Sequence, residues 1–293
     1  MRTFAFAWCV LAAPALFGGP RAALPPSAFA YDASLPLDLR QTAVETRGSV
    51  EIRDITFANL SGGRIAAYVV EPKDGRKWAG ILFVHWYADA PDSNRTQFLA
   101  QAIELAPRGV VSLLIATMWS APGWFEHRNP ADDFDASVHQ VKELRRALDV
   151  LLAQPKVDAA RIAYVGHDFG AMYGAVLAGV ESHRVRAWAL QAGTASFSTW
   201  FLLGRKLGDS ERKAVVDRLA PLDPLLYIGA AAPSPVLFQF ARKDRYVTED
   251  DANAFFAAAK DPKTILWYDG GHELNAQAIE DRQRWLAERL ALR

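Results

Sequence analysis

The hydrophobic positions of the chain alternate at first and then gather into continuous runs. Residues 50–57 alternate between apolar and polar side chains, residues 64–71 have high β-propensity, and the turn signal Ser61-Gly62-Gly63 lies between them. This pattern predicts an antiparallel hairpin at the start of the fold. Residues 80–84 are apolar throughout, which is typical of a strand that is covered on both faces.

Further short apolar runs follow this strand, and segments with helical periodicity lie between and after them. The runs cover residues 110–115, 161–165, 187–190, 236–240 and 264–268. The helical segments cover residues 94–108, 133–153, 172–180, 248–260 and 275–292. Strands that alternate with helices predict a single α/β domain, with a mostly parallel sheet and helices on both faces. The longest excursion between strands, residues 194–233, is too short for a large cap domain.

Composition excludes several classes of protein without indicating a function. The 293 residues include nine tryptophans and are 51% hydrophobic, which excludes a disordered chain. The 33 basic and 33 acidic residues balance, so nothing favours binding to nucleic acid or to an anionic membrane. One cysteine, Cys9, excludes a disulfide framework and a cysteine-rich zinc site. The spacing of the histidines matches no metal-binding motif, and no phosphate-binding glycine motif occurs, so we expect no cofactor. The partner that we expect is a small-molecule substrate. The oligomeric state stays open.

The first 30 residues differ from the rest of the chain. They contain no acidic residue, and their apolar run from Phe4 to Phe17 is too short to span a bilayer. Ala28-Phe29-Ala30 forms a small-x-small cleavage site. We therefore predict a signal peptide over residues 1–30, an N-terminal extension over 31–49 and one domain over 50–293, with a secreted or periplasmic location. Cleavage nearer Ala23, an uncleaved anchor or a buried N-terminal helix would also explain these residues.

One short segment carries the strongest chemical signal. Gly166-His167-Asp168-Phe169-Gly170 follows a predicted strand directly and precedes a helical run. Glycine at both ends permits a sharp turn that exposes the central side chain above the sheet and aims the next backbone N–H at the same spot. This is the pattern of the nucleophile elbow of α/β-hydrolases, with Asp168 in place of serine.

Two more candidate residues follow strand ends later in the chain. Asp244 lies in the loop after the strand that we predict at residues 236–240, and His272 lies in the loop after the last strand. The carboxyl ends of parallel strands meet at one edge of a sheet. We therefore expect Asp168, Asp244 and His272 to form a catalytic triad, in the chain order of α/β-hydrolases.

The chain resembles the α/β-hydrolase superfamily over most of residues 50–292, and its capless outline is most similar to the dienelactone-hydrolase-like and esterase-like branch. That branch commonly carries serine or cysteine at the elbow, whereas aspartate there resembles haloalkane dehalogenases and epoxide hydrolases. The features that carry the resemblance are Val84-His85-Trp86, the Gly-His-Asp-Phe-Gly elbow, the acid loop at residues 242–247 and Gly270-Gly271-His272.

A carboxylate at the elbow favours different chemistry from a serine. Attack of Asp168 on an ester would give an anhydride, whereas attack on an epoxide or on a saturated carbon with a leaving group gives a covalent alkyl ester. His272, oriented by Asp244, would activate the water that hydrolyses this ester. Backbone N–H groups of Phe169 and of Trp86, or of the residue after Trp86, would stabilise the oxyanion.

The remaining aromatic candidates concern the substrate. We expect Tyr87 and the aromatic cluster of Trp119, Trp124 and Phe125 to line a pocket above the elbow. Residues 200–203 form either a lid or an ordinary buried helix. Candidates for stabilising the leaving group, by residue type, are Trp86, Trp119, Trp124, Tyr87, Tyr173 and Tyr227.

Three interpretations of function stay open at this level. The first is hydrolysis through an alkyl-enzyme ester, or by water that Asp168 and His272 activate. The second is an ester or lactone hydrolase in which Asp168 is the general base. The third is a non-catalytic ligand-binding protein on the same fold. Asp269, or less readily Asp223, could replace Asp244 beside His272, while His85 and His167 flank the elbow as structural residues.

Overall fold

The predicted hairpin opens the sheet. In the computed structural model, which describes residues 22–88 and 94–293, β2 (Val50–Ala58) pairs antiparallel with β3 (Arg64–Pro72), so that Val50 lies opposite Pro72. A further strand, β1 (Arg40–Arg47), pairs antiparallel with the outer side of β2. Every residue of β1 is exposed, so the strand has no buried face and gave no hydrophobic pattern to detect. Part of the predicted N-terminal extension therefore belongs to the sheet.

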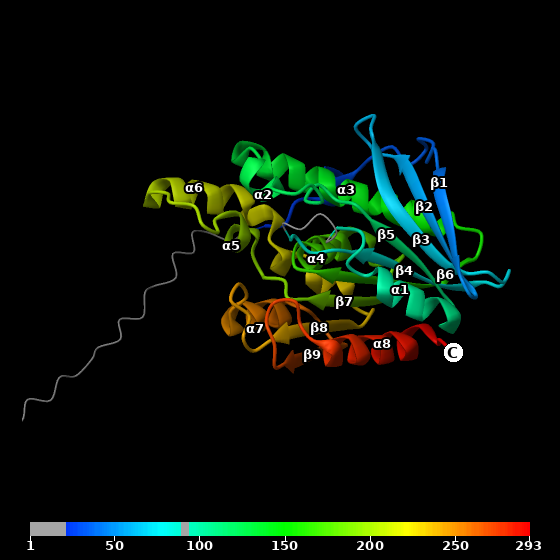
Figure 1. The fold of residues 1–293 in the computed structure, drawn as a ribbon. Helices are drawn as coiled ribbons and strands as arrows, with labels where there is room; N and C mark the ends of the chain where they lie inside the picture. The colour runs from blue at the N-terminus through cyan, green and yellow to red at the C-terminus, as the bar shows by residue number, and fades with distance from the viewer. Residues whose placement is uncertain (1–21, 89–93) are drawn as a thin grey trace, which may run out of the picture.

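The predicted parallel strands form the rest of one nine-stranded sheet in the order β1-β2-β3-β5-β4-β6-β7-β8-β9 (Figure 1). From β5 to β9 all pairings are parallel, and β3 joins β5 antiparallel. Strands β4, β5, β7 and β8 are buried along their whole length, as their mostly apolar runs predicted. The parallel strands are β4 (Trp78–Val84), β5 (Val110–Ile115), β6 (Val157–His167), β7 (Ala187–Gln191), β8 (Val236–Ala241) and β9 (Lys263–Tyr268).

Helices cover both faces of the sheet, as predicted (Figure 1). Helices α3 (Asp133–Leu152) and α4 (Phe169–Glu181) contribute to the larger of two main hydrophobic clusters, whereas α1 (Leu99–Leu105) and α8 (Ala276–Leu290) contribute to the other. The excursion after β7 forms two short helices and three 3₁₀ turns, so the described part of the chain has no large cap domain. The remaining helices are α2 (Trp124–His127), α5 (Phe197–Phe201), α6 (Asp209–Leu219) and α7 (Glu249–Ala258).

The last residues of the predicted leader pack against the domain, whereas its residues 1–21, Cys9 included, lie outside the described residues. Phe29 is fully buried, and its ring meets Tyr227 edge-on at 6.0 Å. Arg145 donates a hydrogen bond to the Phe29 carbonyl at 2.7 Å, and the Leu24 N–H donates to the Tyr227 hydroxyl at 2.8 Å. Cleavage after Ala30 would remove this buried ring from the core. Within the described residues, no helix is long and apolar enough to cross a membrane.

Candidate functional site

The turn between β6 and α4 holds Asp168 in a strained conformation. Its φ of 55° and ψ of −117° lie in a region that residues other than glycine rarely adopt. The two glycines are required because the backbone passes very close to other backbone atoms. A Cβ at Gly166 would lie 2.3 Å from the Gly170 carbonyl oxygen, and a Cβ at Gly170 would lie 2.2 Å from that of Val84. The strand–turn–helix that the sequence predicted is therefore present, with Asp168 at its apex.

Asp244 and His272 meet at the same edge of the sheet. His272 Nδ1 donates to Asp244 Oδ2 at 2.8 Å, and both side chains are more than nine-tenths buried. The other oxygen of Asp244 accepts from the N–H groups of Tyr246 and Val247 at 2.8 and 3.1 Å, which fixes the carboxylate plane.

The two alternative partners for His272 point elsewhere. Asp269 forms an exposed ion pair with Lys243 at 2.7 Å. Asp223 Oδ1 accepts from the Ser196 hydroxyl and the Phe197 N–H. Of the three candidate acids, Asp244 is therefore the one that the fold brings to His272.

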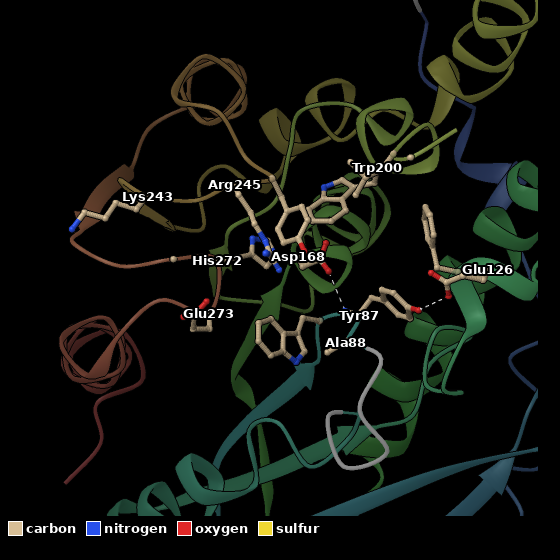
Figure 2. Close-up of a pocket in the computed structure, with 15 residues that line it drawn as sticks. Tyr87, Ala88, Glu126, Asp168, Trp200, Lys243, Arg245, His272 and Glu273 are labelled. Carbon is tan, nitrogen blue, oxygen red and sulfur yellow. Dashed lines mark hydrogen bonds between the residues drawn. The ribbon is translucent and has the colours of Figure 1, made fainter. Parts of the chain in front are cut away.

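The two oxygens of Asp168 have different surroundings. Oδ2 accepts from the Tyr87 N–H at 3.0 Å (Figure 2), and the Phe169 N–H also reaches the carboxylate. Oδ1 is buried and has no hydrogen-bond partner among the described residues, and the same is true of His272 Nε2. Both residues line one pocket, so an unpaired carboxylate oxygen and an unpaired imidazole nitrogen face the same space.

The backbone donor near the elbow is Tyr87 rather than Trp86. The Trp86 N–H donates to Gln97 Oε1 at 2.8 Å, so it is turned away from the carboxylate of Asp168. The sequence located the donor only to the segment after β4. Which of two successive N–H groups faces the elbow depends on the direction of the chain after the strand ends.

Burial and hydrogen bonds shift the pKa values of all three residues. Burial raises the pKa of Asp168 to about 7, although the charge of His272 and the N–H groups of Tyr87 and Phe169 lower it. Burial also acts to lower the pKa of His272, but the hydrogen bond to Asp244 and the negative charge of Asp168 raise it above its usual value. Burial acts to raise the pKa of Asp244, but its hydrogen bond from His272 lowers it overall.

The pocket has a volume of about 780 Å³, and aromatic rings and charged side chains both line it. The Tyr87 hydroxyl donates to Glu126 Oε2 at 3.1 Å at one side of it (Figure 2). The expected Trp119 and Trp124 are not among the lining residues. Trp119 is buried, donates its indole N–H to the His85 carbonyl and stacks on Tyr173, because its loop turns the ring into the core.

Other predicted ligand-facing residues also lie outside the pocket. Trp124 packs edge-on against Phe169 at 5.7 Å. Tyr173 shares a hydrogen bond with Ser137, and the Tyr227 hydroxyl donates to the Pro221 carbonyl. Residues that the sequence did not assign to the pocket take their place. Arg245 and Tyr246 are among these lining residues. The lining also includes Phe125 from the expected aromatic cluster, and Trp200 and Leu203 from the segment considered as a lid.

Solved structures share this architecture. An acetyl xylan esterase from Paenibacillus sp. R4 superposes with a TM-score of 0.73 at 18% identity, covering 90% of this chain and 92% of the other. Acetyl xylan esterase 1 from Thermoanaerobacterium sp. JW/SL YS485 gives a TM-score of 0.70 at 15% identity, covering 92% and 95%. The chain has an α/β-hydrolase fold. A cold-adapted esterase from an Arctic intertidal metagenomic library gives 0.62 at 15% identity, covering 85% and 97%.

The α/β-hydrolase fold predicted from the elbow and the strand order is thus confirmed. At 15–18% identity these likenesses show the fold alone. No protein-family model and no curated protein matches the sequence. Residues 22–88 and 94–293 contain no group of three or more side chains that could hold a metal ion.

Proposed function

We propose that this α/β-hydrolase fold carries a hydrolase whose nucleophile is Asp168, with His272 as general base and Asp244 as its partner. The observation that carries the proposal is that the two oxygens of Asp168 differ in their hydrogen bonding. Oδ2 accepts from the Tyr87 N–H, while Oδ1 and His272 Nε2 are buried with no hydrogen-bond partner among the described residues, and both side chains line one pocket.

This arrangement suits a carboxylate nucleophile. The Tyr87 N–H already donates to an oxygen of Asp168 itself, and the N–H of Phe169 lowers the pKa of the same carboxyl. A substrate carbonyl oxygen would have to displace that oxygen to reach the donors. An electrophilic saturated carbon makes no such demand, because the donors are needed only when Asp168 itself becomes the ester that is hydrolysed.

The reaction has two steps. Asp168 Oδ1 attacks the saturated carbon of an alkyl electrophile, a C–O bond forms, and the leaving group departs with its electron pair. His272 Nε2 then removes a proton from water, which adds to the Asp168 carboxyl carbon. The oxyanion forms on Oδ2, where the Tyr87 and Phe169 N–H groups hold it. Collapse breaks the bond between the carboxyl carbon and Oδ1, and the departing oxygen takes the proton from His272 Nε2 to leave as the alcohol. The carboxyl group that remains contains one oxygen from water and loses its own proton to solvent, which restores the carboxylate.

The pKa values set the working pH. The first step requires ionised Asp168, whose pKa burial raises to about 7. We therefore expect kcat/KM for the alkylation step to rise as the pH increases through about 7. Once Asp168 is alkylated it has no negative charge. Because that charge helps to raise the pKa of His272, the pKa of His272 falls at this stage. His272 is then a free base at the pH at which the second step needs one.

The test is isotopic. The protein is screened against alkyl halides, epoxides and esters, and any substrate found is turned over once in H₂¹⁸O. We expect ¹⁸O in the carboxylate of Asp168, detected by peptide mass spectrometry, and an alkyl adduct on Asp168 that accumulates in His272→Ala. Turnover with ¹⁸O only in the product and no adduct would contradict the nucleophilic role. Binding without turnover across all three panels would favour a ligand-binding protein.

Ester hydrolysis with Asp168 as general base is the second candidate, because the solved structures with this fold include acetyl xylan esterases and other esterases. It requires the Asp168 carboxylate to leave the N–H groups of Tyr87 and Phe169 so that the ester carbonyl can use them. The isotope experiment separates the two, since this mechanism delivers ¹⁸O to the released acid.

We also propose that the leader is cleaved near Ala23 and that the mature protein is secreted or periplasmic. The packing of Leu24 and Phe29 supports this position over one after Ala30. N-terminal sequencing of the exported protein tests it: a mature chain that begins at Tyr31 would contradict the proposed position.

A further inference from the structure

A chain of hydrogen bonds behind the elbow connects the two loops that the proposed reaction needs. The Trp86 N–H donates to Gln97 Oε1 at 2.8 Å. Gln97 Nε2 lies 2.7 Å from His167 Nδ1, and His167 Nε2 lies 2.9 Å from the His272 carbonyl oxygen. One end of this chain is therefore next to the donor Tyr87, and the other end is the backbone of the general base.

The groups at the two ends fix every proton in between. A backbone N–H can only donate, so the Gln97 atom that it meets is the oxygen, and the amide nitrogen faces His167. His167 Nδ1 must then accept, which leaves the proton on Nε2, where it donates to the carbonyl of His272. An imidazolium at His167 could not accept from Gln97.

The surroundings of His167 agree with a permanently neutral ring. The side chain is 1% exposed. Its pKa lies well below the usual value, first because of burial and then because of the positive charges of His272 and Arg282, which face it. The Trp86 ring stacks on His167 at 4.9 Å and lies nearly parallel to the ring of His272 at 6.0 Å. The two neighbouring imidazoles therefore differ in their hydrogen bonds. His272 Nε2 has no partner among the described residues, whereas both nitrogens of His167 have one.

We propose that Gln97 and His167 are positioning residues for the reaction, forming a relay that sets the distance between the oxyanion donor Tyr87 and the general base His272. The inference rests on the proposed function of Asp168 and His272. Neither Gln97 nor His167 touches the substrate in this account. They act because the N–H of Tyr87 and the ring of His272 lie on separate loops, which this chain of hydrogen bonds joins.

The experiment compares Gln97→Leu, Gln97→Glu and a matched control, Gln101→Leu. Gln101 lies on α1 and accepts a hydrogen bond from Arg282 at 2.6 Å, so its loss also removes a hydrogen bond to a buried group but leaves the relay intact. For Gln97→Leu we expect kcat to fall about 10- to 100-fold while KM stays within about twofold, the effect of a displaced catalytic group. Gln101→Leu should retain kcat even though it unfolds at lower denaturant.

Gln97→Glu tests the proton assignment. Its carboxyl group can accept from the Trp86 N–H and share a proton with His167, so we expect most of kcat to return. The shared proton places positive charge on His167 beside His272, whose pKa should fall. The second step, in which His272 is the base, should then reach its full rate at a lower pH. Equal losses in Gln97→Leu and Gln101→Leu, or a Gln97→Glu variant no better than Gln97→Leu, would overturn the proposal.

A spectroscopic readout separates this inference from the proposed function. In the wild-type protein, ¹⁵N NMR should show His167 protonated on Nε2 alone, with no titration between pH 5 and 8. In Gln97→Leu the ring should exchange between tautomers or begin to titrate. A wild-type His167 protonated on Nδ1, or titrating in this range, refutes the relay even if no substrate is found. Turnover failing while this signature holds would refute the proposed function and leave the relay in place.

Discussion

Replacing Asp168 by asparagine should stabilise the protein, and more so at higher pH. Asparagine has nearly the same shape and can accept from the Tyr87 N–H through its carbonyl oxygen, but it carries no charge. The structure buries Asp168 to 1% exposure and raises its pKa from 3.8 to about 7. The unfolded chain therefore ionises this group at a lower pH than the native protein does. Asp168 therefore lowers the free energy of unfolding by an increasing amount as the pH rises from 3.8 to about 7. Above about 7 this effect no longer grows.

The size of the effect follows from linkage. Two of the roughly three pH units of the shift lie above pH 5, so the stability advantage of Asp168→Asn should grow by about 3 kcal/mol between pH 5 and pH 8. Urea unfolding of both proteins at the two pH values measures this difference. Titrations that the substitution leaves unchanged cancel, whereas that of His272 does not, because the charge of Asp168 helps to raise its pKa. The variant should also lose turnover, which is the trade-off expected at a strained catalytic position.

A matched substitution gives the opposite sign. Asp269 is exposed and paired with Lys243, which lowers its pKa, so Asp269→Asn should cost stability above the unfolded pKa of the group, and this cost should vanish as the pH falls through the lower native pKa. If the difference between Asp168→Asn and wild type is the same at pH 5 and pH 8, the native carboxyl does not titrate near 7. The reasoning about its burial would then be wrong.

Three further outcomes follow from particular contacts. Asp244→Asn should lower kcat on the order of 10³- to 10⁴-fold with little change in KM, because the amide no longer favours the tautomer of His272 that is protonated on Nδ1. Steady-state kinetics measures this change. A loss below tenfold would contradict the proposed role of Asp244 as the partner of His272. Gly170→Ala should fail to fold or lose most of its stability, since the new Cβ would lie 2.2 Å from the Val84 carbonyl oxygen. Circular dichroism and denaturation measure this, with Gly48→Ala as the control. At Gly48 nothing lies within 4 Å of the added carbon, and only the positive φ is unfavourable for alanine. Phe29→Ala in the mature chain should cost about 3–5 kcal/mol in unfolding free energy, and a change below 1 kcal/mol would show that the segment is not part of the core.

The pattern of the chain was enough to predict the elements that bury a full face or a full stripe. The strand over residues 110–115 and the helix over residues 133–153 were located almost to the residue, because continuous apolar runs and the 3.6-residue period record burial directly. The strand β1 escaped detection because it is exposed along its whole length. A strand held by backbone hydrogen bonds at a sheet edge leaves little trace in its side chains.

The candidate site divides in the same way. The residues at strand ends could be predicted, since Asp168, Asp244 and His272 each follow a short apolar run, and parallel strands bring their carboxyl ends to one edge. The direction of the side chains in the loops could not be predicted. Trp119 and Trp124 turn into the core, while Trp200 and Tyr246 line the pocket instead. The direction of a loop side chain depends on what it packs against, and those partners are distant in sequence.

By itself the sequence determined the order of strands and helices, the sharp elbow and the identity of the residue at its apex. These depend on local properties: hydrophobic periodicity, the lack of a Cβ in glycine, and the charge of a carboxylate. The tertiary structure decided that the Tyr87 N–H rather than that of Trp86 faces Asp168, that one carboxylate oxygen stays unpaired, and that Gln97 and His167 join the two loops. Those are distances between atoms that lie up to 105 positions apart in the chain, and they are fixed only when the sheet and its two helical layers have packed together.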